Sequence, residues 1–181
     1  YVDEVLHPHV IDLVERYGSS MLWGDGHWGH GPDHWRTREL LERIWSIDPG
    51  IVLNDRWWAA DGDGPAGRPD TVRTFEYEAP ADIVGEPCRG LGSSFCHNRA
   101  ERAEHHLSGH GIVALLTEVV AKGGHLLLGV GPDADGTVPE LQAEPLRDAG
   151  RWIRRHESLL NTSTPWKTWG DEHVRYFDVG G

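Results

Sequence analysis

Residues 13–28 read LVERYGSSMLWGDGHW, and the fold prediction depends on this stretch. A helix-like segment ends at Tyr17-Gly18, a short apolar run follows at residues 21–23, and the run stops at Asp25, which stands between two glycines. The glycines indicate turns, and the apolar run is too short for a helix. This order predicts a helix, then a buried strand, then a carboxylate at the C-terminal end of that strand.

The same alternation of helices and short apolar strands continues along the chain. From apolar residues spaced three and four apart, we expect helices over residues 3–17, 35–47, 112–121 and 141–160. We expect strands at residues 21–23, 51–53, 71–77, 126–128 and 174–179. Unbroken apolar strands are buried on both faces, which is typical of a parallel sheet. The sequence therefore predicts an α/β fold of βα units, with no linker that would divide the chain into two domains.

Composition limits the possible partners. The 181 residues include 29 Asp and Glu against 17 Lys and Arg, which gives a formal net charge of −12. An acidic surface repels phosphate backbones and anionic lipids, so we expect neither nucleic acid nor a membrane as a partner. No apolar run approaches the roughly 18 residues of a membrane span, and no signal-peptide pattern is present, so we expect a soluble chain. The chain begins at Tyr1 and has a single Met, so we expect a processed form or fragment of a longer protein.

Polar side chains follow three of the expected strands. Asp25, the triplet Asn54-Asp55-Arg56, and Glu76 each fall where a strand ends. In parallel α/β folds these ends lie on one face, and two carboxylates there are the minimum for glycoside hydrolysis. One carboxylate attacks the anomeric carbon and the other donates a proton to the leaving oxygen. The nine Trp residues fit a sugar ligand because sugar rings stack on indole faces, although core or surface packing accounts for most tryptophans.

Histidines, cysteines and serines offer weaker sites. His27, His30 and His34 are separated by glycines and a proline and lack the further ligands of a tetrahedral set, so we expect no metal. Cys88 and Cys96 are too few for a disulfide framework, and the sequence leaves open whether they pair. The Ser pair at residues 93–94 lacks the GxSxG elbow of a serine hydrolase.

Ordered blocks along the chain resemble the retaining α-L-fucosidases of glycoside hydrolase family 29. The blocks are LVERYGSSMLWGDGHW at 13–28, NDRW at 54–57, TFEY at 74–77, RGLGSSFCHNR at 89–99, VVAKGGHLLLGVGPDADGTVP at 119–139, and the segment 146–166. The resemblance implies a parallel (β/α) barrel of TIM type. The blocks match strands four to eight, so we expect residues 1–181 to be a single catalytic segment, a half-barrel or truncated barrel lacking the first strands. This chain departs from the family at His97, where Tyr is common, and at 124–129, which read GHLLLG where the family usually has GNLLLN.

Carried over by position, the resemblance implies an exo-acting α-L-fucosidase. Such an enzyme releases terminal α-L-fucose from fucosylated glycoconjugates by double displacement, with a covalent fucosyl intermediate and no cofactor. Asp25 matches the nucleophile, and Glu76 matches the general acid/base, with Glu78 and Glu86 as the alternatives. Arg56 would hydrogen-bond fucose hydroxyls and hold Asp25 ionised. The remaining expected pocket residues are Trp23, Phe95, His27 and Trp28.

Strands missing from the barrel would leave two sheet edges unpaired, so we expect a homo-oligomer that forms through these edges. Two other functions stay open. The chain is a non-catalytic sugar-binding or structural fragment if the missing groups that hold the fucose hydroxyls are essential. A different glycosidase specificity on the same scaffold is the other alternative, and the sequence leaves the linkage preference open.

Overall fold

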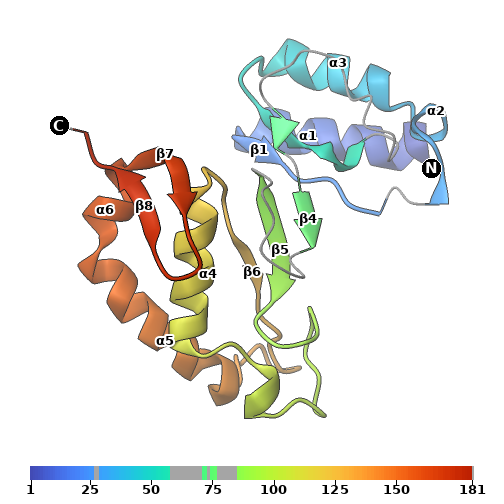
Figure 1. Ribbon diagram of the computed structural model, residues 1–181. Helices are drawn as coiled ribbons and strands as arrows, with labels where there is room; N and C mark the ends of the chain where they lie inside the picture. Colours follow the sequence, from blue (N-terminus) through green and yellow to red (C-terminus); the bar gives the residue numbers. More distant parts are fainter. Residues whose placement is uncertain (27–28, 58–70, 73, 77–84, 181) are drawn as a thin grey trace. The chain divides into compact units, whose positions relative to one another are not determined.

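The computed structural model describes residues 1–26, 29–57, 71–72, 74–76 and 85–180. The chain divides into two compact units, residues 1–74 and residues 75–181. Figure 1 shows the first unit in blue to green and the second in green to red. The expectation of one catalytic segment over the whole chain is untested by this division.

The first unit begins with helix. A π-helical turn, Val2–Leu6, continues into α1, His7–Tyr17, which ends where Gly18 adopts a left-handed conformation at φ +58°. The elements that follow are β1 (Met21–Leu22), α2 (Pro32–Trp35), α3 (Thr37–Ile47), β2 (Val52–Asn54), the 3-10 turn η3 (Asp55–Trp57) and β3 (Thr71–Val72). The three strands lie in the order β1-β2-β3 and are parallel, as the sequence predicts.

Apolar residues from α1, α3, β1 and β2 form one core in this unit. Ile44 of α3, Ile51 and Leu53 are completely buried. The helical period is consistent with most of this core, but Leu13 and Tyr17, which share the apolar spacing of α1, are 46% and 68% exposed. The buried side of α1 is instead formed by Val10, Ile11 and Val14.

The second unit has a parallel sheet and an antiparallel hairpin. Its elements are β4 (Thr74–Glu76), which starts at the boundary, β5 (Glu86–Gly90), η4 (Ala103–His105), α4 (Gly109–Ala121), β6 (Leu127–Gly129), α5 (Glu140–Arg155), α6 (Glu157–Thr162), β7 (Thr164–Gly170) and β8 (Arg175–Asp178). The sheet has the order β4-β5-β6, and β5 runs parallel to β6 with Cys88 opposite Leu127. Strands β7 and β8 pair antiparallel. The structure therefore agrees with a parallel α/β fold and adds a terminal hairpin.

Helices α4 and α5 pack closely in the second unit. A Cβ placed on Gly109 at the start of α4 would lie 2.5 Å from the Cβ of Asp148 in α5, so only glycine permits this approach. Their shared core contains Leu91, Ile112 of α4 and Ala149 of α5. The helix expected over 141–160 is in fact α5 followed by α6, because the chain leaves helical geometry at His156.

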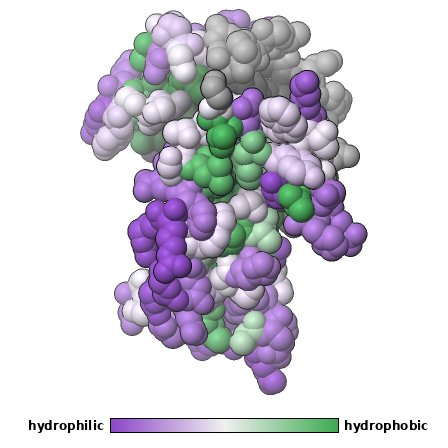
Figure 2. All heavy atoms as spheres, turned by 60° about the vertical axis from the view of Figure 1, so that its left-hand side comes forward, coloured by the Kyte–Doolittle hydropathy of each residue, from purple (hydrophilic) through white to green (hydrophobic). Residues whose placement is uncertain are grey.

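The described residues bear on three broader points, namely barrel closure, the cysteines and membrane-spanning helices. The strands of the described residues form two small sheets and a hairpin and do not close a barrel, so the truncated barrel stays a prediction. Cys88 is buried, Cys96 is exposed, and the two are not joined by a disulfide bond. Across the described part of the chain, no helix has the length and apolar character needed to cross a membrane. On the face shown in Figure 2, hydrophilic residues predominate.

Candidate active site

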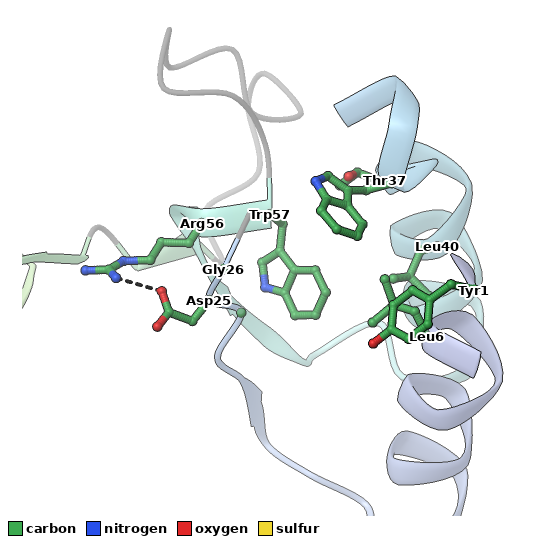
Figure 3. Close-up of a pocket in the computed structure, with 10 residues that line it drawn as sticks. Tyr1, Leu6, Asp25, Gly26, Thr37, Leu40, Arg56 and Trp57 are labelled. Atoms are coloured by element: carbon green, nitrogen blue, oxygen red, sulfur yellow. Dashed lines mark hydrogen bonds and ion pairs between the residues drawn. The ribbon is translucent and has the colours of Figure 1, made fainter. Parts of the chain in front are cut away.

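The structure brings Asp25 and Arg56 together in the first unit. Asp25 follows β1, and Arg56 lies in η3 directly after β2, so both stand beyond the C-terminal ends of neighbouring parallel strands. Arg56 Nη1 donates a hydrogen bond of 2.9 Å to Asp25 Oδ1 (Figure 3). The Asp25 side chain is 50% exposed and that of Arg56 only 16%. Among the described residues, no other donor forms a hydrogen bond with the Asp25 side chain.

Two further contacts hold the guanidinium of Arg56. Arg56 Nε donates to Thr74 Oγ1 at 3.0 Å. The guanidinium carbon lies 4.9 Å from the centroid of the Trp23 ring, a cation–π distance. The predicted pocket residue Trp23 therefore contacts the arginine that pairs with Asp25.

Asn54 fixes the backbone that carries Asp25. Its side chain is completely buried at the end of β2. Asn54 Nδ2 donates to Gly24 O at 2.8 Å, and Gly24 N donates to Asn54 Oδ1 at 2.7 Å. This reciprocal pair extends the ladder between β1 and β2 by one step, so the residue before Asp25 cannot shift without breaking two partly buried hydrogen bonds.

A cavity of about 360 Å³ lies beside Asp25. Figure 3 shows Asp25 and Arg56 on one side of the Trp57 indole and Tyr1, Leu6 and Leu40 on the other. The indole packs over Gly24, because a Cβ at that position would lie 2.8 Å from Trp57 Cε2. An apolar cavity next to a half-exposed carboxylate suits a ligand with a polar and an apolar side.

The other predicted site residues have different outcomes. The backbone of Glu76 ends β4, and its side chain lies outside the described residues, as do Glu78, His27 and Trp28. Phe95 belongs to the second unit, where its side chain is 51% exposed. The roles assigned to these residues therefore stay predictions.

The second unit holds two clusters of buried, titratable side chains. Glu118 of α4 accepts from Lys122 Nζ at 2.7 Å and from Arg175 Nη2 at 3.0 Å, and the Glu118 side chain is 6% exposed. Glu101 and His106 lie 3.3 Å apart between Oε2 and Nε2, also buried. Within the described residues, no three His, Cys, Asp or Glu are arranged to hold a metal ion.

Thr74, Asn54 and Trp57 are site residues that the sequence reasoning did not assign. Asn54 and Trp57 belong to the NDRW block and Thr74 to the TFEY block, so the motifs contained them. Nothing in their residue types indicated that Asn54 would hold Gly24 or that Thr74 would hold Arg56. Both contacts join residues 18 to 30 positions apart, which a local pattern does not reveal.

Comparisons with known proteins agree on one family. The family described as Alpha-L-fucosidase matches residues 1–158. The chain is similar to an α-L-fucosidase of Dictyostelium discoideum, 29% identical over 170 residues that cover 92% of this chain and 37% of that protein. It is also similar to a bovine tissue α-L-fucosidase, 25% identical over 185 residues that cover 100% of this chain and 40% of that protein.

Solved structures show the same likeness. A Thermotoga maritima α-fucosidase in complex with a mechanism-based inhibitor has a TM-score of 0.77 and 33% identity, covering 98% of this chain and 40% of that one. A Paenibacillus thiaminolyticus α-L-fucosidase has a TM-score of 0.80 at 24% identity, covering 98% and 44%, and that likeness concerns the fold alone. The chain thus spans about two-fifths of the length of these relatives.

Proposed function

Because the chain belongs to the α-L-fucosidase family, we propose that it carries the catalytic nucleophile of such an enzyme and hydrolyses terminal α-L-fucosides. The observation that carries the proposal is the position and environment of the Asp25 carboxylate. Its carboxylate stands beyond the end of a parallel strand, half exposed, beside a cavity, with one oxygen on Arg56. A nucleophilic carboxylate needs this combination of a fixed orientation and a free oxygen.

In the proposed reaction, Asp25 Oδ2 attacks the anomeric carbon of the fucoside. The bond from that carbon to the leaving oxygen breaks, and Glu76 gives the oxygen its proton. Water then attacks the fucosyl-Asp25 ester, Glu76 takes the water proton, and the bond to Asp25 breaks. Fucose leaves with retained configuration, and both carboxyl groups return to their starting states.

The remaining pocket assignments are part of the same proposal. Trp23 offers an aromatic ring next to Arg56, and the guanidinium can donate to fucose hydroxyls through the N–H groups that do not face Asp25. Phe95, His27 and Trp28 are proposed to contact the substrate from the positions that the family resemblance gives them. The substrate class is then a fucosylated oligosaccharide or glycoconjugate.

We also propose that the strands belong to a (β/α) barrel whose first strands this chain lacks. The supporting facts are the parallel strand pairs and the two-fifths coverage of the relatives. Within the described residues β1 pairs only with β2, so its other edge is open to a further strand. A homo-oligomer joined at such edges would satisfy them, and sedimentation showing a well-folded monomer would contradict that assembly.

The activity test uses the purified 181-residue chain and an aryl α-L-fucoside, with aryl α-L-rhamnoside and β-D-galactoside as specificity controls. We expect release of the aryl alcohol from the fucoside alone and none with the Asp25→Ala variant. Equal turnover of the galactoside would indicate another glycosidase specificity.

A second candidate function follows from the coverage of about two-fifths. If the folded chain and its Asp25→Ala variant are equally inactive, the chain is a non-catalytic sugar-binding or structural segment. Binding of L-fucose, measured by calorimetry, then separates the sugar-binding form of that alternative from the structural one.

A further inference from the structure

The contacts around Arg56 point to a role for two residues beyond the nucleophile and its arginine. We infer that Asp55 and Thr74 form a hydrogen-bonded relay that orients the guanidinium of Arg56 toward Asp25. Both are positioning residues, because neither contacts Asp25. The effect on catalysis rests on the proposed function, whereas the effect on Arg56 itself does not.

The direction of every hydrogen bond in the relay follows from the chemistry of its members. Thr74 Oγ1 lies 2.7 Å from Asp55 Oδ1 and 3.0 Å from Arg56 Nε. Arginine has only donors, so Thr74 accepts from Nε with a lone pair. Its single hydroxyl proton is then donated to Asp55, because an ionised carboxylate only accepts. The relay therefore runs from Arg56 through Thr74 to Asp55.

Asp55 holds Thr74 at two points. Besides accepting from the hydroxyl, Asp55 Oδ1 accepts from the backbone N–H of Thr74 at 2.9 Å. Asp55 Oδ1 therefore accepts from both the backbone N–H and the hydroxyl of Thr74, and the two bonds together fix the side-chain rotamer of Thr74. Thr74 is 9% exposed, so little water competes for these bonds.

The relay matters because an arginine side chain is long and would otherwise sample many rotamers. The guanidinium is planar, so fixing Nε on Thr74 and Nη1 on Asp25 sets the plane of the whole group. The Trp23 ring makes a third contact with the guanidinium and restricts it further. Without the Thr74 hydroxyl, Arg56 keeps its charge but loses one of the two hydrogen bonds that fix this plane.

The relay also explains why Asp55 and Arg56, adjacent and oppositely charged, have different tasks. Arg56 reaches the half-exposed Asp25, whereas Asp55 accepts its side-chain hydrogen bonds from Thr74. Asp55 acts on Asp25 through two intermediate side chains.

The first measurement requires no activity. Thr74→Val has the shape of threonine without its hydroxyl, and Thr74→Ser keeps the hydroxyl. We expect the Nε–H proton of Arg56, observed by ¹⁵N NMR, to exchange with water about tenfold faster in Thr74→Val than in the parent and to stay near the parent rate in Thr74→Ser. An unchanged exchange rate in a folded Thr74→Val variant would overturn the relay.

The second measurement asks whether the relay affects catalysis. With an aryl α-L-fucoside, we expect Thr74→Val to lower kcat about tenfold with a smaller change in KM, and Thr74→Ser to restore kcat. In an Arg56→Ala background, Thr74→Val should have little further effect, because the group it positions is gone. Fully additive losses would mean that Thr74 acts on stability alone.

The two measurements separate this inference from the proposed function. Faster exchange in a chain that hydrolyses no fucoside supports the relay and contradicts the proposed activity. An active chain in which Thr74→Val changes neither exchange nor kcat contradicts the relay and leaves the activity standing.

Discussion

Asp25 in the first unit and Glu118 in the second are both carboxylates that pair with an arginine, but their surroundings differ. Asp25 is half exposed and has one oxygen on one cation. Glu118 is buried, with Oε1 on Lys122 and Oε2 on Arg175. Of these two carboxylates, only Asp25 has an oxygen with no hydrogen bond from the described residues. A carboxylate–arginine pair thus indicates a reactive group only where one oxygen is left open.

Glu118, Lys122, Arg175 and Trp169 form a cluster with a structural role, which we call the Glu118 cluster. Lys122 Nζ and the guanidinium of Arg175 lie 4.2 and 4.9 Å from the centroid of the Trp169 ring. The cluster therefore ties α4 to both strands of the terminal hairpin. Burial raises the pKa of Glu118, but hydrogen bonds from Lys122 and Arg175 outweigh it and hold that pKa below its ordinary value.

The largest expected effect is on chemistry at Asp25. Asp25→Ala should lower kcat by about 10³-fold or more with little change in unfolding free energy, since the side chain is half exposed. Added azide should restore turnover by attacking the anomeric carbon in place of the missing carboxylate, giving a fucosyl azide of inverted configuration. The matched control is Glu118→Gln, for which kcat should stay near the parent value. Loss of kcat in both variants would contradict the proposal that Asp25 is catalytic and Glu118 is structural.

The second effect is on stability at Glu118. Glu118→Gln keeps the side-chain volume but removes the buried negative charge that pairs with Lys122 and Arg175, so the unfolding free energy should fall by about 3 kcal/mol. Urea denaturation measures this difference. The exposed pair of Arg16 and Asp12 is the control, because Asp12→Asn should cost no more than about 0.5 kcal/mol. Equal losses at both positions would contradict the structural role of the buried cluster.

The third effect concerns the two hydrogen bonds between Asn54 and Gly24, which hold the backbone before Asp25. Asn54→Ala leaves the N–H and the carbonyl of Gly24 without their partner and should lower the unfolding free energy by about 2 kcal/mol. Asn98→Ala, at an exposed asparagine, is the control and should have little effect. A fully stable Asn54→Ala variant would show that the Gly24 backbone finds other partners.

The smallest effect is a pH dependence. The pKa of Glu118 is lower in the folded chain than its ordinary value of 4.5. Its contribution to stability is therefore present above about pH 4.5 and is lost as the pH falls through the folded pKa. The difference in unfolding free energy between the parent and Glu118→Gln should shrink over that range. A difference independent of pH would contradict a lowered pKa.

Apolar spacing predicted α1, α3, α4 and α5, and short apolar runs predicted β1, β2 and β6, because these elements depend on local patterns. Strand β5 was not predicted, since EPCRG contains a proline, a glycine and two charges and has no apolar alternation. Strand β7 was missed for a similar reason, because its apolar residues are mostly exposed and do not alternate with buried ones.

The candidate site was predictable only in part. The position of Asp25 and Arg56 after parallel strands suggested that they meet, and the structure places them 2.9 Å apart. Glu118 was not singled out, because nothing in GHGIVALLTEVVA distinguishes a buried glutamate from an exposed one. Its partner Arg175 lies 57 residues away, and pairing over such a separation depends on the folded chain.

The tie between α4 and the terminal hairpin also affects where this chain can be cut. The family match ends at residue 158, before either hairpin strand begins. A protein engineered to stop there would lose Arg175 and Trp169 and would leave Glu118 with a single cation. We therefore expect residue 158 to be a poor place to end the chain, and recombination with the half of another enzyme should carry the hairpin with it.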